Sequence, residues 1–397
     1  MSQPASPEPI RVLHIITRLI VGGAQENTLY TASLLDKTRY RVEILSGPQT
    51  GSEGSLIEEA RSLDIPLTIL PALVRQIQPG LDLRALREMR RILRSGRYEI
   101  VHTHSSKAGV IGRLAARLER VPIIVHSVHG WSFHDFMSPL TRQVYIWLER
   151  WLATFSSALI VVTRQDELKG RSARIGQPGQ YHLVRSAIPL DGFSLADFDR
   201  AAVRRELQIP EEVFVVGNVG RFSAQKNPLD WIKVCGMVAQ ASPEARFLLV
   251  GDGPLRQEVE EAAERQGIAG RTIFTGLRRD AARMMSAMDV FLLTSLWEGL
   301  PRVIPQAMAM SLPVVATRAD GSIEAIQDDI NGFLCTPGDI QSLAQRCIEL
   351  RNEPLCRAEI GCRARESISG EFDLDKMISQ IDELYQRLLK EHQTGSR

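Results

Sequence analysis

The chain has 397 residues, of which 44% are hydrophobic and 24% are charged, and its formal net charge is +1. This length predicts two domains with sizeable cores, and the near-zero charge argues against a dedicated nucleic-acid-binding protein. No apolar run approaches the roughly 18 residues that a membrane-spanning helix needs, so we expect no such segment.

The two halves of the chain differ in charge. Residues 1–190 carry 24 Lys and Arg against 16 Asp and Glu, whereas the remainder carries 24 against 31. A basic first half suits an anionic surface or substrate, although solvated faces of differing charge would give the same counts. All five Cys lie in the second half without a CxxC pair, which indicates free thiols in a reducing compartment. Residues 1–9 are polar and Pro-rich, so we expect no secretion signal and a cytoplasmic protein.

Short β-branched runs alternate with helix-length amphipathic segments, and this pattern occurs twice. It predicts an α/β protein with two doubly wound, Rossmann-like domains, each built on a parallel sheet covered on both faces. The linker is expected in SAIPLDGFSLADFD, which is rich in turn-forming residues. The expected parts are a tail (1–9), a first domain (10–190), a second domain (191–373), and a C-terminal helix with its tail (374–397). The expected strands are 11–17, 41–47, 67–70, 100–104, 123–129, 158–163, 182–184, 213–220, 246–253, 272–276, 290–295, 313–317 and 332–335.

The loop after the first strand is TRLIVGGAQENT. Ligands of open parallel sheets bind beyond the carboxyl ends of the strands, so this loop is a candidate site. Gly22 and Gly23 allow close backbone approach, and a helix from about Ala24 offers its first amides to an anion. A glycine turn needed only for packing is the alternative. The pattern is not GxGxxG, so a dinucleotide site is poorly supported.

Histidines gather in the first half. His129 is the best candidate for chemistry, because it ends a strand and precedes Gly130; a core histidine is the alternative. Metal-ligand spacing is absent from the cluster, so we expect no metal site. The clustered residues are His102, His104, His126, His129 and His134.

Three helices of the first half have an amphipathic or basic character: 83–97, 107–120 and 143–155. The first is Arg-rich and the last presents two Trp. Such helices suit an anionic bilayer surface. Core packing with solvated Arg explains them equally well.

The second half carries cations after its first strand, in GRFSAQKNP (220–228). Gly220 frees the backbone, and Arg221 and Lys226 precede a helix with Pro228 in its first turn. Two cations and helix amides suit a diphosphate, although surface cations are usually only solvated. VGDGP, with Gly251 and Gly253, and TGLR, with Leu277, end later strands and allow close approach of a ligand or form only tight turns.

A carboxylate stands at the mouth of a helix in SLWEGLPRVIPQ, residues 295–306. Glu298 can accept hydrogen bonds from hydroxyls such as those of a sugar. A carboxylate favoured only by the helix dipole is the alternative. We expect the helix to begin with Leu300 and Pro301, so that Pro305 falls near its first turn.

Taken together, these motifs resemble the GT-B fold glycosyltransferases of family GT4, and specifically the bacterial branch that makes capsular, extracellular and lipid-linked glycans. The resemblance covers nearly the whole chain. It rests on VLHIITRLIVGGAQ, HTHSSKAGVIGRLAAR and VHSVHGWSFH, and on the ordered set GRFSAQKNP, VGDGPLR, FTG and SLWEGLP…AMAMSLPVVAT.

The resemblance implies a retaining transferase that binds its nucleotide-sugar donor mainly in the second of two domains facing each other across a cleft. Arg221 and Lys226 would hold the diphosphate, and Glu298 would contact the donor sugar, with the amides of Gly299 and Leu300 nearby. From the first domain, Gly23 would approach the donor phosphates and His129 would face the transferred sugar.

This sequence departs from the family pattern at two places. The second Glu of the family's E-x7-E motif, which usually holds the ribose, is Gln306 here; a neutral amide can still accept a ribose hydroxyl, but without charge assistance. Arg185-Ser186-Ala187-Ile188 replaces the family's Asn-Gly-Ile/Val-Asp, which leaves the hinge conformation open.

The expected reaction is transfer of a sugar from a nucleotide diphosphate, with UDP favoured over GDP, to a hydroxyl of a glycan or lipid-linked acceptor. We expect no cofactor or metal ion, no nucleic-acid partner, and a cytoplasmic protein that is peripheral on the cytoplasmic face of the membrane. A nucleotide-sugar epimerase on the same fold and a non-catalytic sugar-nucleotide-binding protein remain alternatives.

Overall fold

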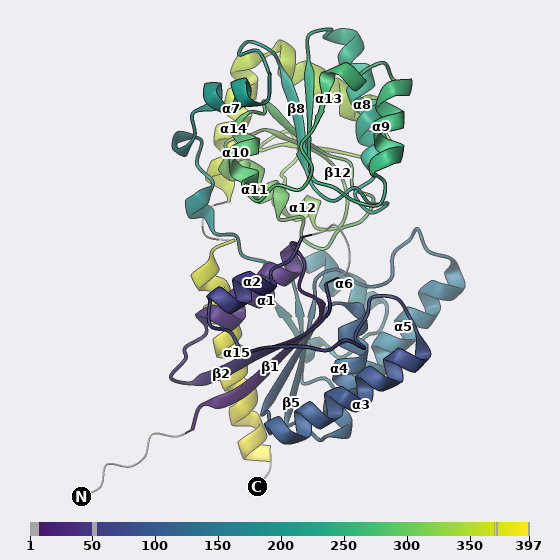
Figure 1. The fold of residues 1–397 in the computed structure, drawn as a ribbon, viewed down its shortest axis with the longest axis vertical. Coiled ribbons are helices and arrows are strands. Elements are labelled where there is room, and N and C mark those ends of the chain that lie inside the picture. The colour runs from purple at the N-terminus through teal and green to yellow at the C-terminus, as the bar shows by residue number, and fades with distance from the viewer. Residues whose placement is uncertain (1–7, 50–53, 369, 371, 396–397) are drawn as a thin grey trace, which may run out of the picture. The chain divides into compact units, whose positions relative to one another are not determined.

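The computed structural model describes residues 8–49, 54–368, 370 and 372–395. The chain forms two compact units (Figure 1). One comprises Met1–Ser186 with Asp375–Arg397, and the other comprises Ala187–Leu374. Each unit is an α/β layer structure, and all thirteen expected strands are present, most of them shortened by a residue or two.

The first unit is built on a seven-stranded parallel sheet of order β3-β2-β1-β4-β5-β6-β7. The order reverses direction at β1 and β4, which is where an open sheet leaves a crevice at its carboxyl edge. The strands are β1 (Ile10–Arg18), β2 (Tyr40–Gly47), β3 (Leu67–Ile69), β4 (Ile100–His104), β5 (Ile123–Val128), β6 (Ala158–Val161) and β7 (Tyr181–Leu183).

Helices cover both faces of this sheet, as its nearly continuous apolar strands require. Leu13 and Ile15 of β1 pack on one face against α3 and α4. Ile16, on the other face, packs against α1 and α2. The helices are α1 (Gly23–Leu34), α2 (Ile57–Ser62), α3 (Pro79–Gly96), α4 (Ser106–Leu118), α5 (Pro139–Ala153) and α6 (Arg164–Ser172).

The final helix, α15 (Leu374–Gly395), belongs to the first unit, although it follows the second unit in the sequence. Its Tyr385 is fully buried, and the ring packs edge-on against Tyr40 of β2 at a centroid distance of 5.9 Å. The Tyr40 hydroxyl donates to Asp382, one turn earlier on the same helix, at 2.7 Å. The apolar stripe of α15 therefore supplies a wall of the first unit's core.

The second unit repeats the design with a six-stranded parallel sheet of order β10-β9-β8-β11-β12-β13. Its strands are β8 (Val215–Val219), β9 (Arg246–Val250), β10 (Thr272–Phe274), β11 (Val290–Leu293), β12 (Val314–Thr317) and β13 (Phe333–Cys335). Its helices are α7 (Arg200–Glu206), α8 (Pro228–Ala241), α9 (Arg256–Arg265), α10 (Ala281–Ser286), α11 (Val303–Ala309), α12 (Ser322–Ala325), α13 (Ile340–Asn352) and α14 (Pro354–Ser367).

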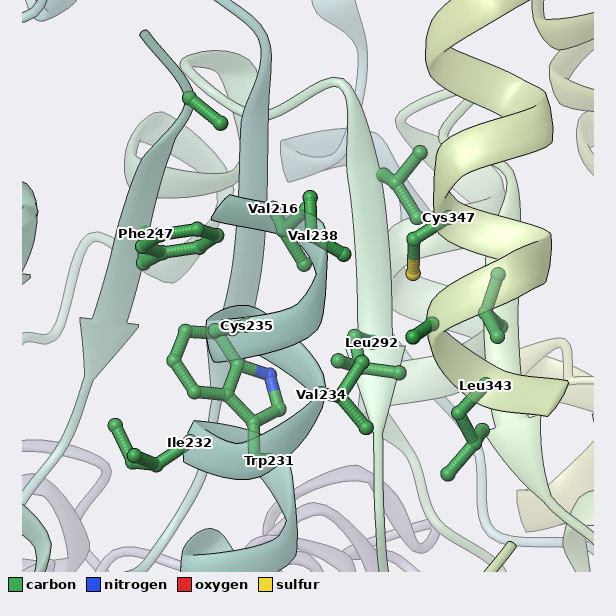
Figure 2. Packing of buried hydrophobic residues seen from close by; sticks show 14 of the residues in the cluster. Val216, Trp231, Ile232, Val234, Cys235, Val238, Phe247, Leu292, Leu343 and Cys347 are labelled. Carbon is green, nitrogen blue, oxygen red and sulfur yellow. The ribbon is translucent and has the colours of Figure 1, made fainter. Parts of the chain in front are cut away.

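A large apolar core of the second unit lies between α8, α13 and the sheet (Figure 2). Trp231 of α8 stands almost perpendicular to Phe247 of β9, with ring centroids 6.4 Å apart. Cys235 and Cys347 lie inside this apolar cluster, where burial raises the pKa of both thiols. Both sulfur atoms therefore act as small apolar groups.

A buried ion pair ties α4 to α5 in the first unit. Arg113 donates from Nη2 to Glu149 at 2.8 Å and from Nε to the carbonyl of Gly109, and the Arg113 and Glu149 side chains are 0% and 3% exposed. A buried pair of this kind contributes little net stability, but removing one partner leaves an uncompensated charge.

We therefore expect Arg113→Met to lower the free energy of unfolding by about 3–5 kcal/mol. Replacing both partners, as Arg113→Met with Glu149→Met, should restore most of the loss, because no charge then remains buried. Urea denaturation of the two single variants and the double variant measures both values. Equal losses in the single and double variants would contradict this account.

Candidate functional site

In the second unit, the loops after two neighbouring strands meet at the carboxyl edge of the sheet. β8 pairs with β11 in parallel, with Val216 opposite Val290. The side-chain amide of Asn218 donates from Nδ2 to the carbonyl of Leu292 at 2.6 Å, which links the ends of the two strands. The loop that carries Lys226 and the loop that carries Glu298 consequently leave the sheet side by side.

Lys226 and Glu298 form an ion pair, with Nζ 2.5 Å from Oε1. The Glu298 side chain is only 6% exposed and that of Lys226 is 21% exposed. Gln225 donates to the other carboxylate oxygen at 3.3 Å and to the carbonyl of Trp297 at 3.0 Å. The sequence singled out both charged residues but not Gln225, whose position beside Lys226 was the only available signal.

Hydrogen bonds between the two loops hold this pair in place. The amide of Leu296 donates to the carbonyl of Gln225 at 2.8 Å, and the hydroxyl of Thr294 donates to the carbonyl of Asn227 at 2.9 Å. Asn227 has a left-handed conformation with φ 47°, which turns the chain into α8 at Pro228. The first amides of this 14-residue helix lie directly after Lys226 and add positive potential there.

The candidate glycines divide into two groups. A side chain at Gly251 would meet the carbonyl of Gly220 at 2.0 Å, and one at Gly253 would meet the carbonyl of Phe222 at 2.4 Å. At these two positions, packing of the protein itself requires glycine. At Gly22 and Gly220 the nearest atoms are side-chain oxygens, at 2.8 Å and 3.3 Å. A side chain at Gly22 or Gly220 would meet only other side chains, so close packing of the backbone does not explain glycine at these two positions.

The remaining candidates of the second unit differ in how exposed their residues are. Arg221 is half-buried, Gly299 and Leu300 are buried, and Leu277 is 44% exposed. The expectation that the helix begins with Leu300 and Pro301 is wrong, because α11 begins at Val303.

Gln306 lies on α11 and is half-buried. Within the described residues its side chain makes no hydrogen bond, whereas its backbone amide donates to the carbonyl of Arg302 at 3.1 Å. Pro305 is the third residue of α11, in the first turn, where a missing backbone N–H removes no helical bond.

In the first unit, His129 is half-buried directly after β5. Its Nε2 lies 3.2 Å from Nδ1 of His104, and Nε2 of His104 lies 2.9 Å from Nδ1 of His14. The sequence pointed to His104 and His129 but missed His14. The register of β1 with β4, which sets His14 opposite His102, brings it into the group.

The ligand atoms of His14, His102 and His104 all lie within 4.8 Å of one another, close enough to share a metal ion. The ring nitrogens are already engaged with one another or with protein hydroxyls: His102 lies 2.6 Å from the hydroxyl of Tyr385 and 2.7 Å from that of Ser127. His126 faces away, toward Thr103, at 2.9 Å.

Burial keeps these histidines neutral. It lowers the pKa of His14 to about 3, and it lowers the pKa values of His102, His104 and His126 well below the usual range, with the neighbouring charges adding to the effect. A charged imidazolium in this apolar interior would lose its hydration without gaining a carboxylate partner.

These shifts predict acid sensitivity confined to the first unit. A base whose pKa is lowered by folding contributes stability above its unfolded pKa of about 6.5, and that stability is lost as the pH falls below this value. Between pH 7 and 5.5, each of the four buried histidines should cost about 1 kcal/mol of unfolding free energy. Amide hydrogen exchange, corrected for its intrinsic pH dependence, measures each unit separately.

The second unit is the internal control for this prediction, because residues 187–374 contain no histidine. A first unit that keeps its protection at pH 5.5, or a second unit that loses as much, would contradict the account.

Two units, each built on a parallel sheet with helices, are the architecture expected of the GT-B class. Residues 22–185 match the family model for the glycosyl transferase 4-like domain, and residues 213–353 match that for glycosyl transferases group 1. The chain belongs to the GT4-type glycosyltransferases, and it is therefore an enzyme.

Curated relatives support this assignment along the whole chain. The UDP-Gal:alpha-D-GlcNAc-diphosphoundecaprenol alpha-1,3-galactosyltransferase of Escherichia coli is 28% identical over 95% of this chain and 96% of its own length. The putative glycosyltransferase EpsD of Bacillus subtilis is 25% identical over 77% of this chain and 80% of its own length.

Among solved structures, HepE of Anabaena in complex with UDP-glucose is 25% identical, with a TM-score of 0.80 over 95% of this chain and 100% of HepE. WaaG, a glycosyltransferase involved in lipopolysaccharide biosynthesis, is 15% identical with a TM-score of 0.74, covering 94% of this chain and 98% of WaaG. Both confirm the expected GT-B fold.

Proposed function

We propose that this enzyme transfers a sugar from a UDP-sugar to a hydroxyl of a glycan or lipid-linked acceptor, with retention of the anomeric configuration. The observation that carries the proposal is the ion pair of Lys226 and Glu298, in the loops that follow β8 and β11. A cation beside helix amides suits a diphosphate, and an acceptor-only carboxylate suits sugar hydroxyls. The UDP-glucose bound by HepE and the lipid diphosphate in the name of the Escherichia coli relative favour this donor and acceptor.

Donor binding would exchange the contacts of this pair. The diphosphate replaces Glu298 as the partner of Lys226, and the sugar hydroxyls replace Lys226 as the partner of Glu298. In the free enzyme the two groups pair with each other, so neither buried charge lacks a partner before the donor binds. In the proposed step the bond between the anomeric carbon and the diphosphate breaks, and the acceptor oxygen bonds to that carbon from the same face.

The diphosphate gains charge as it leaves. Lys226, Arg221 and the first amides of α8 would stabilise that charge, and the leaving phosphate would take the acceptor's proton. These fixed positive groups support a reaction that needs no metal ion or cofactor. Gln306 would accept the ribose hydroxyls.

The function is tested by incubating the full chain with a panel of UDP- and GDP-sugars without acceptor and measuring nucleotide release. One UDP-sugar should be hydrolysed slowly, and Lys226→Met and Glu298→Gln should each lower that rate at least about tenfold, the value of one charge-assisted hydrogen bond. Lys233→Met, which removes an exposed lysine of α8 paired with Asp230, is the matched control. Equal rates in all variants would refute the site, and a product in which the altered sugar stays on its nucleotide would show an epimerase.

We further propose that the first unit docks on the cytoplasmic face of an anionic membrane, where a lipid-linked acceptor would lie. α5 exposes an apolar stripe at helical spacing: Leu140 is 78% exposed, Val144 56%, Trp147 64% and Trp151 41%. Such a face, with Trp and flanking Arg, suits the interface of a bilayer. None of the helices in the described residues is long and apolar enough to cross a membrane.

The excess of basic residues in the first half favours an anionic lipid surface as the occupant proposed for this face. Leu140→Ser combined with Trp147→Ser should reduce binding to phosphatidylglycerol vesicles at low salt by at least about tenfold, because each side chain loses roughly 1.5–3 kcal/mol of burial. Leu355→Ser is the control, since Leu355 is 88% exposed on the second unit. Sedimentation with vesicles measures binding, and unchanged binding of the double variant would refute this face.

A further inference from the structure

A cavity of about 220 Å³ lies in the first unit where the end of α4 meets the end of α5. Arg117, Arg120 and Pro122 line it from the end of α4 and the turn that follows, and Thr154 and Phe155 line it from the turn after α5. Both turns lead directly into strands, β5 and β6, so the cavity is at the amino edge of the sheet. Substrates of open parallel sheets bind at the opposite, carboxyl edge, and the proposed transfer therefore makes no use of this cavity.

Two positive charges border the cavity without a negative partner. Arg117 and Arg120 are both exposed, and within the described residues neither side chain makes a hydrogen bond or an ion pair. None of the described residues that line the cavity is acidic. An anion that entered the cavity would therefore meet two guanidinium groups and no carboxylate.

The carboxylate that lies between the two arginines in the sequence is already engaged elsewhere. Glu119 accepts from Nε of Arg90 at 2.6 Å and from Nε of Arg94 at 2.9 Å, and its side chain is only 8% exposed. Both partners belong to α3. Glu119 is therefore held toward α3 and does not neutralise the arginines of the cavity.

Arginines near the end of a helix commonly bind its last carbonyl groups, which would explain this pair without a ligand. In α4 those acceptors are taken, because the carbonyls of Ala115, Ala116 and Arg117 accept backbone amides from the turn that follows. In α5 the carbonyl of Trp151 accepts the hydroxyl of Thr154 at 2.7 Å. Both guanidinium groups therefore remain available as donors to a ligand.

The chemistry and the surroundings of the cavity indicate its ligand. Guanidinium groups match the oxygens of a phosphate in planar, charge-assisted pairs, and two of them can hold one phosphate. Trp151, the last member of the apolar stripe on α5, packs edge-on against Phe155 of the cavity at a centroid distance of 5.3 Å. The cationic cavity is thus continuous with an exposed apolar face, a combination that fits a phosphate joined to hydrocarbon chains.

We propose that this cavity binds the phosphate group of an anionic phospholipid, with Arg117 and Arg120 as its donors, while the hydrocarbon chains lie along the apolar stripe of α5. The proposal rests on the docking of the first unit on an anionic membrane proposed above. It adds a defined lipid site to that face, at the edge of the sheet away from the strand ends where an acceptor would bind.

The site is tested on the full chain with dihexanoylphosphatidylglycerol below its micelle concentration, with binding followed by broadening of the lipid's ³¹P signal. Arg117→Gln combined with Arg120→Gln should weaken binding at least about tenfold, because charge-assisted hydrogen bonds to the phosphate are lost. Both arginines are exposed, so we expect the variant to fold. No binding by the unsubstituted chain would overturn the proposal.

Arg87→Gln combined with Arg91→Gln is the matched control, because it removes the same charge from two exposed arginines of α3. It should change the affinity for the monomeric lipid less than about twofold, since a single headgroup senses only nearby charges through the salt. Equal weakening by the two double variants would overturn the proposal in favour of diffuse attraction.

Inorganic phosphate separates a lipid site from a site for free phosphate. It lacks the chains that would contact the α5 face, so it should bind at least about tenfold more weakly than the lipid. Equal affinity for inorganic phosphate and the lipid would overturn the assignment to a phospholipid.

The docking proposal is tested apart from the cavity. Leu140→Ser combined with Trp147→Ser should reduce vesicle binding but leave most of the affinity for the monomeric lipid, because neither residue lines the cavity. Binding of vesicles without binding of monomeric lipid would refute the cavity and leave the docking face standing. Binding of monomeric lipid that depends on Arg117 and Arg120, without binding of vesicles, would support the cavity and refute the docking face.

Discussion

The parallel pairing of β8 with β11 is the constraint on which the candidate site depends. Parallel neighbours end at the same edge, so the loops after them leave the sheet together. This places a lysine and a glutamate, 72 residues apart in the chain, within 2.5 Å of each other. The carboxylate is nearly buried and needs a counter-charge there, and the pairing supplies one before any ligand binds.

Buried polar groups are satisfied in two ways. Charged side chains are paired, as Lys226 is with Glu298 in the second unit and Arg113 is with Glu149 in the first. The buried histidines of the first unit are instead neutral, and they bond to one another, to Ser127 and to Tyr385. A charged pair can exchange partners with a charged ligand, which suits the diphosphate binding proposed for Lys226, whereas neutral groups that satisfy one another offer no charge to a ligand.

Much of the fold was predictable, because the strands of a parallel sheet are buried on both faces and therefore appear in the sequence as nearly continuous apolar runs. Both strand series were found in this way, and so were Lys226 and Glu298, which follow such runs directly. The contact between these two residues was not predictable, because it depends on which strands are neighbours. For the same reason His14 was missed, and Tyr385 reaches the first unit from a helix that follows the second unit in the chain.

The errors also have physical causes. The turn after β11 continues past Leu300 to Val303, because the helix start is decided by local backbone contacts that composition does not reveal. Gly251 and Gly253 have the composition of a ligand loop, yet the close approach of the neighbouring loop already requires glycine there. Gly22 carries no such requirement, so it remains the better candidate for contact with a ligand.

The most direct test of the account is calorimetric binding of UDP and of the intact UDP-sugar to the unsubstituted chain, Lys226→Met and Glu298→Gln. If Lys226 holds the diphosphate and Glu298 the sugar, Lys226→Met should weaken both ligands by about tenfold or more, and Glu298→Gln should weaken only the UDP-sugar. Two results would contradict this division of roles: both substitutions weaken UDP binding equally, or neither substitution weakens the binding of either ligand.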